Sequence, residues 1–129
     1  MALDGNRSPE PSQKGEERAI NTALAMADLQ PESIDYVNTH GTGSPLGDKT
    51  EVAALKSVGL HRGLLNSTKS LIGHCLTAAG VVEAIATILQ MKFGFCHPTK
   101  NLVTPIDASL NWVKEISVQA EIKYARGNV

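Results

Sequence analysis

Residues 34–48 read IDYVNTHGTGSPLGD, and this stretch decides the fold. Its first five residues alternate and are rich in β-formers, so they predict a short buried strand. Three glycines and a proline then predict a loop over Thr39–Gly47. Asp48 stands where a helix N-cap belongs, and Glu51 follows three residues later as in a capping box. A helix is therefore expected to run from Asp48 to Ser57.

The same order of elements is repeated further along the chain. Leu64–Ser67 is a second short strand candidate, and a loop is expected over Thr68–His74. The long segment Leu76–Met91 is apolar on nearly all sides, which is typical of a buried core helix rather than a surface helix.

Two further periodic segments complete the predicted domain. Gly15–Leu29 carries the apolar stripe of an amphipathic helix, and Ser117–Tyr124 alternates like a half-buried strand. Alternating strands and helices predict an α/β fold, with a mixed sheet, parallel core strands and a buried central helix. The domain is expected over residues 14–129, after a polar linker or added leading segment at 1–13. Both glycine-containing loops would then lie at the carboxyl ends of strands, where chemistry collects in such folds.

Composition excludes several classes of protein. The chain has 129 residues, and its 12 lysines and arginines nearly balance 13 aspartates and glutamates, so no nucleic-acid partner is expected. Polar residues interrupt the longest apolar stretch at Glu83, Gln90 and Lys92, so no membrane span is expected. Two cysteines, Cys75 and Cys96, form neither a zinc pattern nor a disulfide framework. No metal site is expected, and a reducing, cytoplasmic location is the default.

The first loop offers two interpretations. A phosphate-binding loop needs a glycine, four residues and then Gly-Lys-Ser/Thr, and neither the spacing nor Asp48 before Lys49 fits that pattern. His40 could instead face a ligand, with the hydroxyls of Thr42 and Ser44 as hydrogen-bonding groups. The loop could equally be a structural turn whose histidine binds only backbone.

The second loop makes an organised polar site more specific. His74 also follows a strand, so the two loop histidines could converge on one pocket. Glu83 lies inside an almost wholly apolar helix, where an unpaired carboxylate would be costly. Lys69 is the nearest cation in the preceding loop and is the expected partner of Glu83.

The remaining histidines and cysteines have plainer interpretations. His61 lies in a polar turn and should be solvated, and His97 precedes a proline and should be structural. Cys96 is expected to be buried and inert. Cys75 should be a small packed thiol, although the start of a helix can activate a thiol and leaves a nucleophile open there.

Four motifs occur in order between about Gly15 and Ser117. They are HGTGSPLGD at 40–48, STKSLIGH at 67–74, AAG with EA at 78–84, and HPT with N at 97–101. Together they resemble the C-terminal half of β-ketoacyl-acyl-carrier-protein synthases, the condensing enzymes of fatty-acid and polyketide assembly, which have the thiolase fold.

The resemblance implies a decarboxylative Claisen condensation. A malonyl group carried by an acyl carrier protein would lose carbon dioxide, and the enolate would attack an acyl thioester. By the family pattern His40 and His74 are the catalytic histidines, which donate hydrogen bonds to the thioester oxygen as it becomes negative. Lys69 matches the active-site lysine of the family, and Glu83 matches its buried acidic partner.

The resemblance also implies partners. Thr42 matches a hydroxyl that contacts pantetheine, and Ser44 stands where many members have threonine. No cofactor is implied beyond the phosphopantetheine that carries the substrate. The expected partners are an acyl carrier protein, an N-terminal half that carries the nucleophile, and a second copy in a homodimer of the complete enzyme.

Two family features are missing from the sequence. Neither cysteine occupies the nucleophile position, and the glycine-rich Phe-Gly-Gly-x-Asn turn near the C-terminus is absent. The chain is therefore expected to hold half of an active site, as a truncated enzyme, a subunit of a split synthase or a module of a larger polyketide synthase. This incomplete acyltransferase is expected to be inactive alone, to expose apolar surface and to associate. The alternative is a non-catalytic or decarboxylase-only partner domain.

Overall fold

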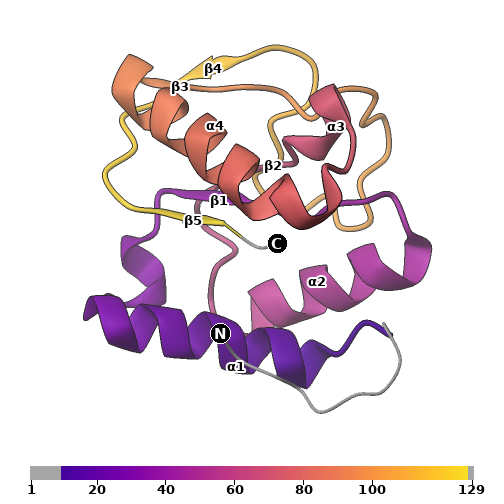
Figure 1. Cartoon of the computed structure of the whole chain (residues 1–129), viewed down its shortest axis with the longest axis vertical. Coiled ribbons are helices and arrows are strands. Elements are labelled where there is room, and N and C mark those ends of the chain that lie inside the picture. The colour runs from indigo at the N-terminus through magenta and orange to yellow at the C-terminus, as the bar shows by residue number, and fades with distance from the viewer. Residues whose placement is uncertain (1–9, 128–129) are drawn as a thin grey trace.

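The computed structural model describes residues 10–127, which form a layered α/β fold around a small parallel sheet (Figure 1). In this sheet β1 (Tyr36–Asn38) lies between β2 (Leu64–Asn66) and β5 (Ala125–Gly127). An antiparallel pair joins β3 (Phe95–Cys96) to β4 (Val118–Gln119) in a second sheet. The predicted α/β fold with parallel core strands is confirmed, and its antiparallel part is confined to the second sheet.

Helices cover both faces of the parallel sheet (Figure 1). Helices α1 (Gln13–Ala27) and α2 (Pro45–Ser57) pack together on one face, where Val37 joins their apolar residues in one core cluster. Tyr36 points to the opposite face, because successive side chains of a strand alternate. There it joins a second cluster with residues of β3 and of α4 (Ala79–Phe93).

Helix α4 buries its polar side and exposes its apolar side, whereas a helix that is apolar on nearly all sides is expected to be buried. Its buried positions are Ala79 and the polar residues Glu83, Thr87 and Gln90. Its exposed side is apolar and includes Val81, Ile85, Ile88, Leu89 and Phe93. The prediction of a buried central helix is therefore wrong for this chain, because the partners of its polar groups lie inside the domain and fix which side faces inward.

The segment Leu76–Phe93 is also long and apolar enough, by length and composition, to cross a membrane. By length and composition, therefore, the polar residues of this segment do not exclude a membrane span, contrary to the expectation from sequence. Core helices of larger proteins meet the same criterion, and in this chain the segment begins with a 3₁₀ turn, η2 (Leu76–Ala78), before α4.

Helix α2 begins earlier than predicted. Its N-cap is Ser44, whose hydroxyl accepts a hydrogen bond from the Gly47 N–H, and Pro45 occupies the first helical position. Proline suits that position because its fixed φ is helical and its missing N–H would have no partner there. Asp48 therefore lies in the first turn of the helix, and its predicted role as the cap is wrong.

Smaller differences concern loops and ends. The second loop contains a short helix, α3 (Lys69–Ile72), and a 3₁₀ turn, η1 (Pro31–Ser33), precedes β1. Of the strand predicted over Ser117–Tyr124 only β4, at Val118–Gln119, is observed, and β5 begins after that range, at Ala125. Most of the predicted linker lies outside the described residues, and near its end Ser12 caps α1 by accepting from the Gly15 N–H.

Candidate active site

The two predicted loops meet at one edge of the sheet. Strands β1 and β2 are parallel, and Asn38 pairs with Asn66, so the loops that follow the two strands leave the sheet at the same end. The rings of His40 and His74 lie edge to face, with centroids 5.5 Å apart and an interplanar angle of 83°. The convergence of the two histidines that the sequence predicts is confirmed as geometry.

A single carboxylate holds the loop that carries His40. Glu51 of α2 is buried, and it accepts hydrogen bonds from the N–H groups of His40 (2.7 Å) and Gly41 (3.0 Å). The predicted capping box is wrong, because this carboxylate binds the preceding loop rather than the helix N-terminus. Gly41 has a φ of 42°, and a Cβ there would lie 2.8 Å from Ser67 and Thr39.

The hydrogen bonds of His74 define its tautomer. Its Nδ1 accepts a hydrogen bond of 2.9 Å from the Leu76 N–H. A backbone N–H can donate only to a bare ring nitrogen, so the neutral ring carries its proton on Nε2. Leu76 adopts a positive φ of 50°, a strained conformation for a non-glycine residue, in the turn that makes this contact.

Lys69 and Glu83 form a buried ion pair, as the sequence predicts. Their side chains are only 4% and 3% exposed, and Nζ of Lys69 contacts Oε1 of Glu83. The other carboxylate oxygen, Oε2 of Glu83, is buried without a hydrogen-bond partner among the described residues. The pair fixes a positive charge beside the two histidines.

His40 is held in its neutral form. Burial lowers its pKa below the usual 6.5, and the positive charge of Lys69 lowers it further. At neutral pH the imidazole is therefore uncharged and can donate a hydrogen bond without a formal charge of its own.

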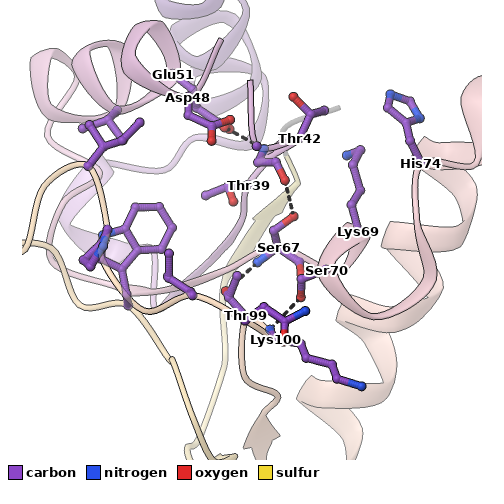
Figure 2. Close-up of a pocket in the computed structure, with 18 of the residues that line it drawn as sticks. Thr39, Thr42, Asp48, Glu51, Ser67, Lys69, Ser70, His74, Thr99 and Lys100 are labelled. Carbon is purple, nitrogen blue, oxygen red and sulfur yellow. Dashed lines mark hydrogen bonds between the residues drawn. The ribbon is translucent and has the colours of Figure 1, made fainter. Parts of the chain in front are cut away.

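A pocket of about 380 Å³ opens beside this cluster. Figure 2 draws Thr42, Lys69 and His74 along one part of its wall. His40 is not among the residues that line this pocket, but its ring packs edge to face against that of His74, which does line it. Ser44 is not part of the wall either, and its hydroxyl caps α2.

Sequence reasoning missed two further residues of the pocket wall. Thr99 lines the pocket, and its hydroxyl accepts a hydrogen bond from the Ser67 N–H (3.1 Å). Ser70 also lines it, and its hydroxyl accepts from the Lys100 N–H (2.9 Å). The 97–101 motif was the available signal, but neither residue type nor spacing shows which side chains of a loop turn inward.

The other candidates lie outside this wall. His61 is exposed, and Cys96 is fully buried with a pKa that burial raises to about 12, so both predictions are confirmed. Cys75 is half-buried at the start of η2. His97 is buried and hydrogen bonded, as expected of a structural histidine. Within residues 10–127 no three histidine, cysteine or carboxylate side chains are grouped so that they could hold a metal ion.

Comparison with known proteins defines the class. Residues 2–103 match the model of the C-terminal domain of β-ketoacyl synthases, so the chain belongs to this family. The ishigamide ketosynthase/chain length factor has the same fold, with a TM-score of 0.90 and 34% identity over 98% of this chain and 32% of that chain. A type II polyketide synthase ketosynthase, solved in complex with its acyl-carrier protein and bound to the hexaketide, gives 0.84 and 28% over 98% and 32%. The thiolase-like fold is therefore confirmed.

Two curated relatives narrow the comparison. The polyketide biosynthesis malonyl-ACP decarboxylase PksF of Bacillus subtilis (strain 168) is 52% identical over 125 residues, which are 97% of this chain and 30% of the relative. The 3-oxoacyl-(acyl-carrier-protein) synthase 2 of Staphylococcus aureus is 36% identical over 94% of this chain and 31% of the relative. The chain thus spans about a third of the length of these relatives.

Proposed function

We propose that this chain is the C-terminal part of a condensing enzyme that joins a malonyl-carrier-protein thioester to an acyl thioester with loss of carbon dioxide. The observation that carries the proposal is the edge-to-face pair of His40 and His74 beside the buried charge of Lys69. The nucleophile that holds the acyl group belongs to a part of the enzyme outside this chain.

The proposed chemistry uses the histidines as hydrogen-bond donors. The bond between the malonyl α-carbon and its carboxylate breaks, carbon dioxide leaves, and the electron pair forms the enolate of the thioester. The Nε2–H of His74 and the neutral ring of His40 donate to the enolate oxygen as it becomes negative. Removal of one such donor in comparable sites costs about 3–4 kcal/mol of transition-state stabilisation.

The carbon–carbon bond forms in the next step. The enolate carbon attacks the acyl carbonyl, a tetrahedral oxyanion forms, and it collapses by expelling the enzyme's nucleophile. Lys69 acts through its fixed charge, which Glu83 holds in place and which favours neutral His40. Lys69 and Glu83 therefore support the electrostatics of the site, and no proton transfer from either is required.

The malonyl group would reach the histidines on a phosphopantetheine arm. Thr42 lines the pocket with an exposed side chain and offers a hydroxyl to the amides of that arm. Ser44 is exposed nearby, but its hydroxyl already caps α2, so its contribution to pantetheine binding would be secondary. No other cofactor enters the proposed reaction, and its protein partner is an acyl carrier protein.

The exposed apolar side of α4 supports the second proposed partner. A row of large apolar side chains faces outward while the polar side of the helix is satisfied inside the domain. Exposed apolar patches of this kind mark interaction sites. We assign this side to the N-terminal half of the enzyme, and the complete protein is proposed to be a homodimer.

One specific observation favours a second candidate function. The relative that is 52% identical over nearly the whole chain is named as a malonyl-ACP decarboxylase. An enzyme of that kind would perform the first step with the same histidines, and the enolate carbon would then take a proton from water to give an acetyl-carrier product without condensation.

The test uses the complete polypeptide, including the part that supplies the nucleophile. Carbon dioxide release from malonyl-carrier protein and formation of the 3-oxoacyl product are measured separately. Alanine at His40 or His74 is expected to lower kcat for carbon dioxide release by about 100-fold or more, while His61→Ala, at an exposed histidine, leaves it unchanged.

The two products decide between the outcomes. Full activity of either histidine variant would overturn the assignment of that donor. Carbon dioxide release without 3-oxoacyl product would replace condensation with decarboxylation alone, and both products together would support the condensing enzyme.

A further inference from the structure

A buried chain of hydrogen bonds lies behind the site and ends at the residue before Lys69. His97 is 9% exposed, and Thr68 is 3% exposed. The Nε2 of His97 lies 3.1 Å from the hydroxyl of Thr68, and its Nδ1 lies 2.9 Å from the carbonyl oxygen of Pro98. The same hydroxyl donates a hydrogen bond to Oδ1 of Asn38 (2.7 Å).

The few hydrogens in this chain of hydrogen bonds limit how its groups can be paired. The Pro98 carbonyl can only accept, so Nδ1 of His97 must carry a hydrogen for that contact to be favourable. Burial lowers the pKa of His97, so the ring is neutral at pH 7 and its Nε2 is bare. The single hydrogen of the Thr68 hydroxyl is therefore shared between two buried acceptors, Oδ1 of Asn38 at 2.7 Å and the bare Nε2 of His97 at 3.1 Å.

These residues connect the elements that build the site. Asn38 ends β1, two residues before His40, and Thr68 directly precedes Lys69. The N–H of His97 donates to Oε1 of Gln90 (2.9 Å), which lies on α4, the helix that also carries Glu83. A displacement of His97 would therefore change contacts at the ends of β1 and β2 and on α4.

We propose that His97 is a positioning residue for this site: its Nε2 shares the Thr68 hydroxyl hydrogen with Asn38 and thereby fixes Lys69 relative to His40. The proposal rests on the proposed function for its kinetic consequence, but its hydrogen-bond assignment stands on the geometry alone. His97 touches no substrate and acts only through Thr68.

The assignment is tested first on the 129-residue chain, without any activity. Long-range proton–nitrogen NMR of histidine-labelled protein at pH 7 reports which ring nitrogen carries the hydrogen. The expected result is a neutral His97 with its hydrogen on Nδ1, and loss of that signal in His97→Asn assigns it. A hydrogen on Nε2 would overturn the proposal.

The kinetic test uses carbon dioxide release by the complete polypeptide. Asparagine places its amide near the position of Nδ1, whereas glutamine reaches the position of Nε2 and can still accept from Thr68. His97→Asn is expected to lower kcat by about tenfold to 100-fold with little change in KM, since small misplacements of catalytic groups have effects of this size. His97→Gln should restore most of the activity.

Thr68 provides the second variant, which keeps the test decisive if His97→Asn does not fold. Thr68→Val removes the hydroxyl at nearly constant shape, and with it the bond to Asn38 as well, so it should lower kcat at least as much as His97→Asn, whereas Thr68→Ser should keep the activity. The double variant Thr68→Val/His97→Asn should be no worse than Thr68→Val alone, because Thr68→Val has already removed the contact with His97. Additive losses, or equal losses in His97→Asn and His97→Gln, would overturn the positioning role.

Failure of this inference differs from failure of the proposed function. If the unmodified enzyme releases no carbon dioxide, the proposed function fails and the NMR result still decides the hydrogen bond. If His40→Ala removes the activity while Thr68→Val and His97→Asn retain it, the inference alone is wrong.

Discussion

His40 and Gly41 owe their positions to the carboxylate of Glu51, which lies on the helix that follows their loop. Two backbone N–H groups converge on its two oxygens, so the turn is fixed from outside rather than by its own sequence. The close approach of Gly41 to Ser67 then fixes the distance between the first and second loops. Single atoms at this turn therefore decide where the His40 ring lies.

Gly41→Ala tests this constraint. A φ of 42° is strained for alanine, and the new Cβ would lie 2.8 Å from the Ser67 and Thr39 side chains. The positive φ alone costs about 1–2 kcal/mol, and the contacts add to it. Urea unfolding of the 129-residue chain should therefore show a loss greater than that strain.

Gly43→Ala is the matched control. Its φ is also positive, at 80°, but no atom lies within 4 Å of the added Cβ. Only the strain should remain, so the loss in unfolding free energy should be smaller than for Gly41→Ala. Equal losses would mean that the approach to Ser67 does not constrain the loop.

Prediction from sequence succeeded or failed at single residues for identifiable reasons. The pairing of Lys69 with Glu83 was predictable, because a carboxylate inside an apolar helix needs a cation and one lies in the preceding loop. The role of Glu51 was not, because a glutamate three residues after a possible cap has the same sequence whether it binds its own helix or a loop. A tertiary contact, which the sequence does not show, decides which of the two the Glu51 carboxylate binds.

Helix α4 shows how an element can be apolar overall and still bury its polar side. Glu83, Thr87 and Gln90 recur at helical spacing and face the sheet. Both polar atoms of the Gln90 side chain are hydrogen bonded: its Oε1 accepts from Asn66 and His97, and its Nε2 donates to the Tyr36 hydroxyl. These bonds set the rotation of the helix about its axis, which brings Glu83 against Lys69.

The ion pair between α3 and α4 should be sensitive to the loss of one partner. Glu83→Gln leaves the ammonium of Lys69 buried without a countercharge, which typically costs 3–5 kcal/mol. The double variant Lys69→Met/Glu83→Leu removes both charges and should be nearer to the unmodified chain in unfolding free energy. Urea unfolding measures both, and a Glu83→Gln loss below about 1 kcal/mol would contradict the importance of the pair.

At the level of elements, sequence predicted type better than orientation or bounds. The strands β1 and β2 and the main helices were expected near their observed positions, because alternation and helical periodicity are local properties. The inward side of α4 was missed because apolar residues fill most of the helix and the partners of Gln90 lie in distant parts of the chain, although the helical spacing of its polar residues was a signal. The start of α2 was missed because Ser44 and Asp48 are both good caps.

The whole chain has an interior on both faces of its sheet, but one large apolar surface remains uncovered on α4. In the described residues, Val81, Ile85, Ile88 and Phe93 are all more than half exposed. The order of elements was enough to predict the parallel sheet and the meeting of the two loops. The uncovered surface was expected only from the family resemblance, because the residue pattern alone predicts a helix buried on nearly all sides.

This surface predicts association of the isolated chain. Sedimentation should show species larger than a monomer, and Ile85→Glu with Ile88→Lys should shift them toward the monomer. Each buried side chain of this kind contributes about 1.5–3 kcal/mol, which corresponds to roughly tenfold or more in affinity. Val103→Glu, at an exposed loop residue away from α4, is the control and should change nothing. A compact monomer before substitution would contradict the prediction.

The parallel register of β1 and β2 also determines where extra residues can be accommodated. An insertion within Tyr36–Asn38 would turn all following side chains to the other face and break the pairing with β2. The turn around His61 and Arg62 is exposed and joins α2 to β2 at the opposite end of the strands. A fluorophore-binding tag or reporter peptide inserted there would lengthen only a surface turn and leave both histidine loops in place.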